Sequence, residues 1–335
     1  MIGTASGAPV SITGLGCHVP ERVVTNEELA QLVDTSDEWI RMRTGICERR
    51  FAADDEALSD IALPAARAAL EAAGISATDV DLLIVATVTP DTLFPSTAAI
   101  LADQLGASEA GAYDLAAGCT GFMYGIAQAF GMVSAGLSHR ALVIGADVLS
   151  KLMNFADRST CVLFGDGAGA AVLERVGEVG FLGFELGADG SGGPDLQLPA
   201  GGSRIPTTAD TVARGEHYVQ MNGRQVYKFA TRILVSSAEN VLAECGLTAA
   251  DIDVYVPHQA NIRIIDHAVA KLGIPEDRVV VNVDRYGNTS SASIPLALGE
   301  ALQQGRVQKG DTVLMTGMGA GLTWGSAVMR WTEAP

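Results

Sequence analysis

The sequence has few basic residues and few cysteines, and each shortage argues against a class of protein. Lys and Arg number 22 against 39 Asp and Glu, so the net charge at pH 7 is −17. Because nucleic-acid binding requires clustered positive charge, we expect no nucleic-acid partner. The cysteines form no Cys-x-x-Cys pair, which predicts neither a disulfide framework nor a zinc site and is typical of a reducing compartment. They are Cys17, Cys47, Cys119, Cys161 and Cys245.

Long apolar runs are also missing. No run reaches the length needed to cross a bilayer, and residues 1–9 lack the basic and apolar regions of a secretion signal. We therefore expect a cytoplasmic protein with no membrane partner. Charged residues make up only 18% of the chain and hydrophobic residues 48%, a composition that favours a tightly packed α/β protein.

The pattern of apolar and polar residues predicts alternating strands and helices. We expect strands at 10–16 and 22–24, a helix at 27–34 capped by Asn26, and another capped by Ser36. Helical spacing runs over 58–73 and stops at Gly74. A continuous apolar run at 80–87 has the length of a buried strand. Residues 187–210, rich in Gly, Pro, Ser and Thr, predict an excursion over the surface.

An internal repeat shows that the chain is duplicated. Residues 70–82 resemble residues 242–254 at an offset of 172, and the same offset pairs residues 141–145 with 313–317. Near the end the offset falls to 156, so the first half carries about 16 extra residues near 146–162. We predict two similar α/β halves, at residues 1–176 and 177–335. Two such halves can bring equivalent loops together at a pseudo-twofold centre.

One stretch stands out within the first half. An apolar segment from Tyr113 runs through small residues to Cys119 and then enters a helical run that starts at Phe122. A cysteine at the N-terminus of a helix has a lowered thiol pKa and becomes a nucleophile, because unpaired N–H groups and the helix dipole favour the thiolate. A small buried hydrophobic residue is the alternative interpretation.

Three further segments in the second half contain residue types that serve catalysis. His258 follows a predicted buried strand, and Asn288 lies in a polar loop that enters a helix. The glycine-rich residues 316–325 can let backbone N–H groups approach a substrate oxygen, as in an oxyanion hole. Each has a structural alternative. His258 can be a structural histidine with its hydrogen bonds satisfied inside the protein, Asn288 can be a helix cap, and the glycines can serve a tight turn.

Together these segments resemble a known family. Gly-Cys-Thr-Gly-Phe, Pro-His-Gln-Ala-Asn, Tyr-Gly-Asn-Thr-Ser-Ser-Ala-Ser and Gly-Met-Gly-Ala-Gly-Leu-Thr-Trp-Gly follow in this order. In this they resemble β-ketoacyl-ACP synthase III, the initiating condensing enzyme of bacterial fatty-acid synthesis, where ACP is acyl carrier protein. The resemblance implies a thiolase-like five-layer αβαβα fold made of two duplicated halves. It also implies a homodimer and no metal or redox cofactor.

The resemblance also implies a mechanism. Cys119 takes the acyl group of a short acyl-CoA, and backbone N–H groups of Cys119, Gly319 and Ala320 hold the oxyanion. His258 and Asn288 then stabilise the enolate that forms when a malonyl thioester on ACP loses CO2. The product is a 3-ketoacyl-ACP. A degradative thiolase is disfavoured because it needs a second catalytic cysteine late in the chain, and the last cysteine is Cys245.

Binding residues are implied in the same way. They are Trp39, Arg43, Arg158 and Asn261 for CoA, and Arg263 for the carrier-protein dock. Phe94 is implied for the acyl pocket, which the family shapes in some members across the dimer interface, and its bulk favours a short starter. The spacing of Arg224, Lys228 and Arg232 itself predicts a basic stripe on one helix face. We interpret this stripe as a dock for the acidic carrier protein, although such a stripe is usually only a solvated face.

Three alternatives remain open at this stage. One is a priming enzyme or acyltransferase of a polyketide or other secondary-metabolite pathway, which shares all four motifs. Another is a non-catalytic partner subunit that binds carrier protein, which the intact Cys119, His258 and Asn288 disfavour. The third is a plant-type polyketide synthase that works on free CoA esters, disfavoured by the Trp39 segment, the chain ends and the basic stripe. The starter acyl group is not determined by the sequence.

Overall fold

The computed structural model describes residues 1–5 and 7–332, and these form two five-stranded sheets. The strand order is β2-β8-β7-β5-β6 in the first sheet and β1-β9-β14-β13-β12 in the second. In sheet order, the strands of the first are β2 (Val10–His18), β8 (Gly167–Arg175), β7 (Arg140–Asp147), β5 (Leu82–Ala86) and β6 (Gly111–Leu115). Those of the second are β1 (Ile2–Thr4), β9 (Phe181–Ala188), β14 (Thr323–Arg330), β13 (Thr312–Gly319) and β12 (Val254–Pro257).

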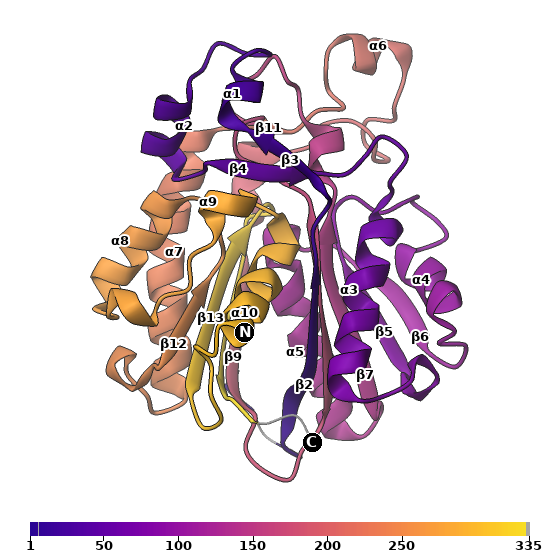
Figure 1. Ribbon diagram of the computed structural model, residues 1–335, viewed down its shortest axis with the longest axis vertical. Helices are drawn as coiled ribbons and strands as arrows, with labels where there is room; N and C mark the ends of the chain where they lie inside the picture. The colour runs from indigo at the N-terminus through magenta and orange to yellow at the C-terminus, as the bar shows by residue number, and fades with distance from the viewer. Residues whose placement is uncertain (6, 333–335) are drawn as a thin grey trace.

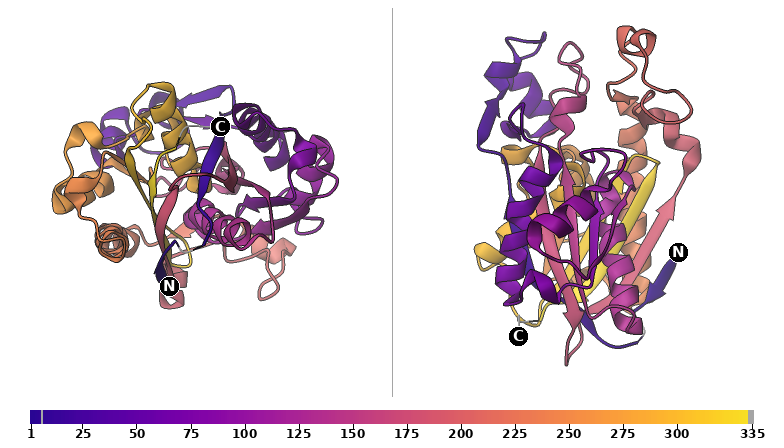
Figure 2. Two further views of the ribbon diagram at one scale, coloured as in Figure 1. Left: turned by 90° about the horizontal axis from the view of Figure 1, so that it is seen from below. Right: turned by 90° about the vertical axis from the view of Figure 1, so that its right-hand side faces the viewer.

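Helices form three layers around and between the sheets. They are α5 (Gly121–Ala135) and α10 (Ser293–Gln303) in the middle, α3 (Leu58–Ala73) and α4 (Thr97–Leu105) outside the first sheet, and α7 (Gly223–Glu244) and α8 (Ile262–Leu272) outside the second. Helices α5 and α10 contact both sheets (Figure 1), and the views in Figure 2 show the same stacking. The largest core lies here, around Phe122 and Leu298, so the predicted thiolase-like five-layer fold is confirmed.

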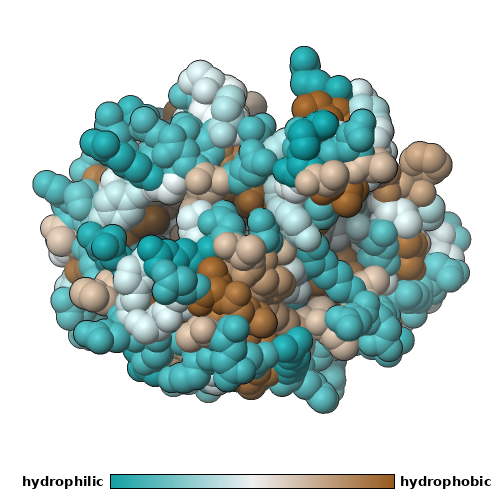
Figure 3. Space-filling view, turned by 90° about the horizontal axis from the view of Figure 1, so that it is seen from above, coloured by the Kyte–Doolittle hydropathy of each residue, from teal (hydrophilic) through white to brown (hydrophobic). Residues whose placement is uncertain are grey.

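The remaining short elements cap the end of the molecule that is uppermost in Figure 1 or connect the layers. The strands among them pair as two small antiparallel ribbons. One ribbon pairs β3 (Arg22–Thr25) with β4 (Glu48–Phe51), and the other pairs β10 (Leu196–Gln197) with β11 (Gln220–Met221). The short helices are α1 (Asn26–Leu29), α2 (Asp37–Thr44), α6 (Ala209–Ala213) and α9 (Val283–Tyr286). Seen from above, this end is mostly hydrophilic, with separate hydrophobic patches (Figure 3).

The duplication predicted from sequence is present in the topology. The offset of 172 residues carries β5 onto β12, β7 onto β13 and α5 onto α10. The connection from β7 to β8 has 19 residues and that from β13 to β14 has three, which locates the extra segment of the first half. One strand breaks the repeat. The counterpart of β6 is the short helix α9, and β1 instead extends the second sheet at its opposite edge, beside β9.

The boundary predicted between the halves, at residues 176 and 177, falls in the connection from β8 to β9. Strand β1 comes from the first half of the sequence but belongs to the second sheet. Residues 198–210, within the predicted excursion, are largely exposed. In the described part of the chain, no helix is both long and apolar enough to cross a membrane.

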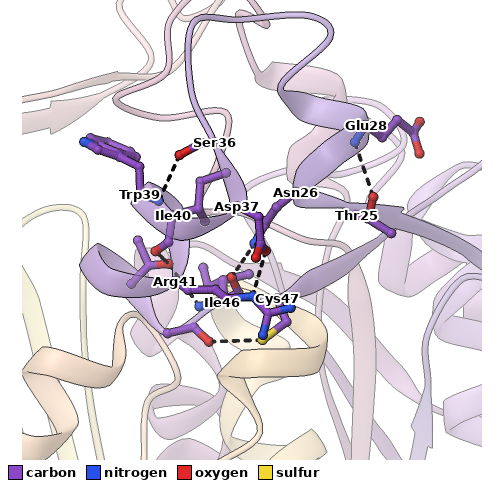
Figure 4. A network of polar contacts seen from close by, with 12 residues as sticks. Thr25, Asn26, Glu28, Ser36, Asp37, Trp39, Ile40, Arg41, Ile46 and Cys47 are labelled. Carbon is purple, nitrogen blue, oxygen red and sulfur yellow. Dashed lines mark hydrogen bonds and ion pairs between the residues drawn. The ribbon is translucent and has the colours of Figure 1, made fainter.

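Local sequence explains where several helices begin and end. Helix α3 spans the predicted residues and stops where Gly74 adopts φ 66°, a left-handed conformation that glycine accepts without strain. The Ser36 hydroxyl accepts the backbone N–H of Trp39, so Ser36 caps α2 as predicted (Figure 4).

The predicted helix at 27–34, with Asn26 as its cap, is wrong. Helix α1 has a single turn, and the side chain of Thr25 caps it by accepting from Glu28 N (Figure 4). The Asn26 side chain is buried and is used elsewhere, because it donates to Asp37 and to the backbone carbonyl of Ile46. A side chain that joins neighbouring segments in this way is not available to cap its own helix.

Candidate active site

Cys119 lies at the turn from the first sheet into the central helix. Strand β6 ends at Leu115, a short 3-10 turn (η2, Gly118–Thr120) follows, and α5 begins at Gly121. Gly118 adopts φ 56°, and a Cβ atom there would lie 2.6 Å from the carbonyl oxygen of Ala320. Only glycine fits such a position. This close approach holds the turn against the glycine-rich end of β13 and leaves the Cys119 side chain 8% exposed.

The expected low pKa of the Cys119 thiol is wrong for the resting site. The pKa of this thiol is raised to about 11, mainly by burial and also by the nearby carboxylate of Asp147. The Ser290 hydroxyl and the backbone N–H of Ala320 act in the opposite direction. Desolvation of the charged form therefore outweighs the N-terminus of α5, and Cys119 rests as a thiol at neutral pH.

His258 follows the last residue of β12, and its backbone N–H donates to Thr316 O at 2.8 Å. Its Nδ1 lies within hydrogen-bond distance of the Ser293 hydroxyl, which also accepts the N–H of Gln259. We assign the single hydroxyl proton of Ser293 to the bond with Nδ1, which leaves the ring proton on Nε2. Burial lowers the pKa of His258 to about 4, so the ring is neutral at physiological pH. The Nε2 atom is buried and has no hydrogen-bond partner.

Asn288 is held by its backbone on both sides. Its N–H donates to Leu163 O at 2.9 Å, and its carbonyl accepts from Gly165 N at 3.0 Å. Its side-chain oxygen accepts the backbone N–H of Ser290 at 2.9 Å. Because the oxygen is engaged, the carboxamide directs its NH₂ group toward the cavity as a hydrogen-bond donor.

The structure brings Cys119, His258 and Asn288 to the wall of one narrow cavity of about 100 Å³. A second cavity, of about 230 Å³, also has Cys119 in its wall and is mostly apolar. We call the first the tunnel and the second the acyl cavity. The acyl cavity is lined by Val88, Gly118, Cys119, Leu149, Leu152, Phe164, Leu196, Gln197, Leu198, Val219, Ser290 and Ala320.

The turn after β13 also lies at the cysteine. A Cβ atom on Gly319 would lie 2.4 Å from Cys119 N, so the two backbones are in contact. The N–H of Ala320 is directed at the Cys119 sulfur. Gly319 and Ala320 thus lie next to Cys119, the third residue of the predicted oxyanion hole.

Trp39, Arg43, Arg158 and Asn261 lie together although they come from three separate segments, since Trp39 and Arg43 share α2. The guanidinium carbons of Arg43 and Arg158 lie 5.7 Å and 5.2 Å from the centre of the Trp39 ring. Asn261 lines the tunnel and donates from its side chain to Arg43 O. Figure 4 shows Trp39 directed away from the polar network that holds α2. An aromatic face with two cations beside the tunnel suits a ligand that carries a flat ring and phosphates.

Arg224, Lys228 and Arg232 are exposed on α7, as the predicted stripe requires. Arg263 on α8 joins them, because its guanidinium lies 5.7 Å from the ring of Tyr227. Within the described residues, none of the four cations has a carboxylate within 4 Å. Tyr227 also lines the tunnel, so this basic surface lies at one of the tunnel walls.

Phe94 is not part of the acyl cavity of its own chain. Its side chain is 84% exposed, and the adjoining Leu93 is 81% exposed. Within one chain, the cavity is bounded instead by the leucines of a 3-10 turn, η3 (Leu149–Leu152), and by Leu198 and Val219. The expectation that Phe94 limits the starter is therefore not met by the single chain.

Three residues that matter to this geometry were missed from the sequence. Ser293 orients His258, Ser290 engages Asn288, and the carboxylate of Asp147 accepts both the N–H and the hydroxyl of Ser291. Both serines fall within the polar loop around Asn288 that the sequence singles out. Their nearness in sequence to Asn288 could therefore have marked them as residues of the site. Nothing local distinguishes Asp147 at the end of a buried strand. Among the described residues, no group of His, Cys, Asp or Glu side chains is suited to hold a metal ion.

Two duplicated halves with a cysteine at the central helix, and with a neutral histidine and a carboxamide facing it, define a thiolase-like protein. Models of 3-oxoacyl-ACP synthase III match residues 113–190 and, for its C-terminal part, residues 242–331. β-Ketoacyl-ACP synthase III of Symbiobacterium thermophilum is 57% identical over 96% of this chain and 98% of the relative. The chain belongs to the β-ketoacyl-ACP synthase III family.

Solved structures agree with this assignment. The β-ketoacyl-ACP synthase III of Thermus thermophilus is 49% identical, with a TM-score of 0.89 over 97% of this chain and 100% of the other. The priming β-ketosynthase of the R1128 polyketide pathway is 37% identical, with a TM-score of 0.91 over 98% of each chain.

Proposed function

We propose that this protein condenses a short-chain acyl-CoA starter with malonyl-ACP to give 3-ketoacyl-ACP and CO2, the reaction that initiates fatty-acid synthesis. One observation carries the proposal. The Cys119 thiol shares a cavity with two neutral donors, His258 Nε2–H and the NH₂ group of Asn288. The higher identity to fatty-acid synthases than to the polyketide priming enzyme favours fatty-acid synthesis.

In the first half-reaction, the sulfur of Cys119 attacks the thioester carbon of the acyl-CoA. The new C–S bond replaces the bond to CoA, and the thiol proton leaves with the CoA sulfur. Backbone N–H groups of Cys119, Gly319 and Ala320 stabilise the oxyanion that forms on the way. The acyl chain then occupies the acyl cavity.

In the second half-reaction, malonyl-ACP loses CO2, and the electron pair of the broken bond becomes an enolate. Neutral donors stabilise this developing charge, and no base is needed because CO2 leaves rather than a proton. The His258 pKa of about 4 suits this role, because a protonated imidazolium is not required at any step. The enolate carbon then attacks the acyl group on Cys119 and releases the thiolate. This chemistry needs no metal or redox cofactor.

We also infer the binding partners from these surfaces. Trp39 and Arg158 hold the adenine of CoA, Arg43 its phosphates, and Asn261 the pantetheine arm inside the tunnel. The acidic carrier protein docks on Arg224, Lys228, Arg232 and Arg263. The supporting observation is that none of them has a carboxylate within 4 Å in the part of the chain that the structure describes. The enzyme acts in the cytoplasm, where these substrates are made.

We propose that the protein is a homodimer. Strand β6 is at the edge of the first sheet, and an unpaired edge is suited to strand pairing with a second copy. The exposed Leu93 and Phe94 precede α4, which packs on β6, so they supply an apolar surface near this edge. Phe94 would then reach the acyl cavity of the other copy. Sedimentation equilibrium tests the proposal, and a monomer at micromolar concentration contradicts it.

Intact-protein mass spectrometry tests the proposed reaction. We expect brief mixing with acetyl-, isobutyryl- or hexanoyl-CoA to add the mass of the acyl group to the wild type and nothing to Cys119→Ser. Addition of malonyl-ACP should then remove the acyl mass and yield 3-ketoacyl-ACP. If no CoA ester loads the folded wild type, the proposal of a CoA-primed enzyme fails.

A further inference from the structure

Ser290 has a backbone conformation that its residue type disfavours. Its φ is 53°, and among the described residues it is the one non-glycine residue with positive φ. The offset of 172 residues pairs Ser290 with Gly118, and each is the first residue of a 3-10 turn in its half. Gly118 has nearly the same φ, 56°. The first half thus uses glycine at this position, whereas the second half retains a side chain in spite of the strain.

The hydroxyl of Ser290 does not stabilise the fold through a hydrogen bond. The residue is 1% exposed, and its Oγ has no well-formed hydrogen-bond partner in the resting site. A buried hydroxyl without a partner is costly, and such groups occur where a reaction supplies the missing partner. The neighbouring Ser291 differs, since its hydroxyl is engaged by Ala86 O and by Asp147.

The group that faces the Ser290 hydroxyl is the sulfur of Cys119. Both residues line the acyl cavity. The approach of the hydroxyl already lowers the pKa of the thiol, against the larger effect of burial. Two other titratable side chains lie near this sulfur. Asp147 acts against a thiolate through its charge, and His258 is neutral, so neither supplies a positive charge that would stabilise it.

We propose that Ser290 is a further catalytic residue, whose hydroxyl donates a hydrogen bond to the sulfur of Cys119 when that sulfur carries negative charge. This inference rests on the proposed function, in which the sulfur is anionic twice. It attacks the acyl thioester as the S–H bond breaks, and it is released when the enolate carbon takes the acyl group. The serine keeps its proton throughout, and the released thiolate regains a proton from water.

The strained backbone is explained by the one hydrogen bond that Ser290 makes in the resting site and the one that we propose. Its N–H must reach the side-chain oxygen of Asn288, while its Oγ must reach the sulfur of Cys119. Ser290 in this way connects the donor used in condensation with the nucleophile used in acyl transfer.

The pH dependence of Cys119 alkylation by iodoacetamide tests the proposal. Mass spectrometry of the intact protein, with Cys119→Ser as the blank, identifies the site. We expect Ser290→Ala and Ser290→Gly to raise the apparent thiol pKa by about one unit, which slows alkylation about tenfold at a fixed pH below that pKa. Condensation should slow about tenfold or more in both variants. Ser237→Ala, which removes another buried serine hydroxyl at a position that lines neither cavity, should match the wild type.

The two variants separate the hydroxyl from the backbone strain. Glycine relieves the strain and alanine does not, so equal effects identify the hydroxyl. An unchanged thiol pKa in both variants overturns the proposal, as does a shift in Ser290→Ala that is absent from Ser290→Gly. Alkylation requires no acyl-CoA, so this result stands even if the wild type fails to accept an acyl group and the proposed function is lost.

Discussion

At the scale of residues, the site consists of donors whose other bonds are already satisfied. Ser293 engages one nitrogen of His258, and Ser290 N–H engages the oxygen of Asn288. In each case the partner determines which atom faces the cavity. Preorganised neutral donors of this kind stabilise an enolate without reorganising during the reaction.

The role of Ser293 leads to the first prediction. Ser293→Ala frees His258 Nδ1, so the ring can take the other tautomer and present an acceptor to the enolate. We expect malonyl-ACP decarboxylation to slow about tenfold or more, while acyl transfer from CoA to Cys119 is unchanged. Release of labelled CO2 measures the former and intact mass the latter. Equal loss in both steps contradicts the assigned tautomer.

At the scale of elements, the insertion between β7 and β8 supplies part of the wall of the acyl cavity. Its 3-10 turn η3 supplies Leu149 and Leu152, and the second half has no counterpart because only three residues join β13 to β14. The cavity volume of about 230 Å³ exceeds that of the apolar cavity of roughly 150 Å³ that holds benzene. The single chain therefore has room for a starter longer than acetyl.

The second prediction tests this cavity. Leu152→Trp fills part of it, so transfer of a hexanoyl group to Cys119 should slow about tenfold relative to transfer of an acetyl group. Leu137→Trp, at a position 78% exposed and remote from the cavity, is the matched control and should leave the ratio unchanged. Competition between the two CoA esters, read by intact mass, measures the ratio. The same ratio in Leu152→Trp and the wild type would show that the starter lies elsewhere.

The third prediction concerns the basic stripe on α7. We expect Arg224→Glu with Lys228→Glu to raise the KM for malonyl-ACP about tenfold, because charge attraction steers the acidic carrier protein. Acyl transfer from CoA should keep its wild-type rate. Arg67→Glu, on the helix that covers the opposite sheet, should alter neither. An unchanged KM in the double variant removes the proposed dock.

At the scale of the whole molecule, the thiols make stability depend on pH. Burial raises the pKa of Cys17 to about 12 and those of Cys119 and Cys161 to about 11, all from an ordinary value of 9.0. Above pH 9 the unfolded chain loses these protons and the folded chain keeps them. The contribution of these buried thiols to the free energy of unfolding is therefore complete below pH 9, and it is lost as the pH rises through the folded pKa values.

The fourth prediction follows from that linkage. We expect the Tm of the wild type to fall between pH 8 and pH 10.5. The fall should be shallower in Cys17→Ala with Cys161→Ala, which removes two of the three thiols. Calorimetry at matched ionic strength measures both slopes. Parallel slopes would show that groups other than these thiols dominate alkaline unfolding.

Much of the fold was predictable because its signals are local or periodic. Helix α3 and its end at Gly74 follow from apolar spacing and a left-handed glycine. Strand β5 follows from a continuous apolar run. The duplication follows from self-similarity within the sequence. It also predicted that the loops of the two halves, with Cys119 in one and His258 in the other, can meet at a pseudo-twofold centre. The error at Asn26 arose because its side chain makes tertiary hydrogen bonds that no local pattern reveals.

The sequence by itself determined the two-half α/β architecture, the family and the side chains that face one another at its centre, because periodicity and motifs are properties of the chain order. Only the tertiary structure decided the protonation states of those side chains and which of their atoms face the cavity without a hydrogen-bond partner. Burial raised the pKa of Cys119 and lowered that of His258, since both depend on the solvent that packing excludes. Contacts across the two halves positioned Ser290 and Asp147, and a contact between two separate segments of the second half positioned Ser293 against His258. Such contacts exist only after folding.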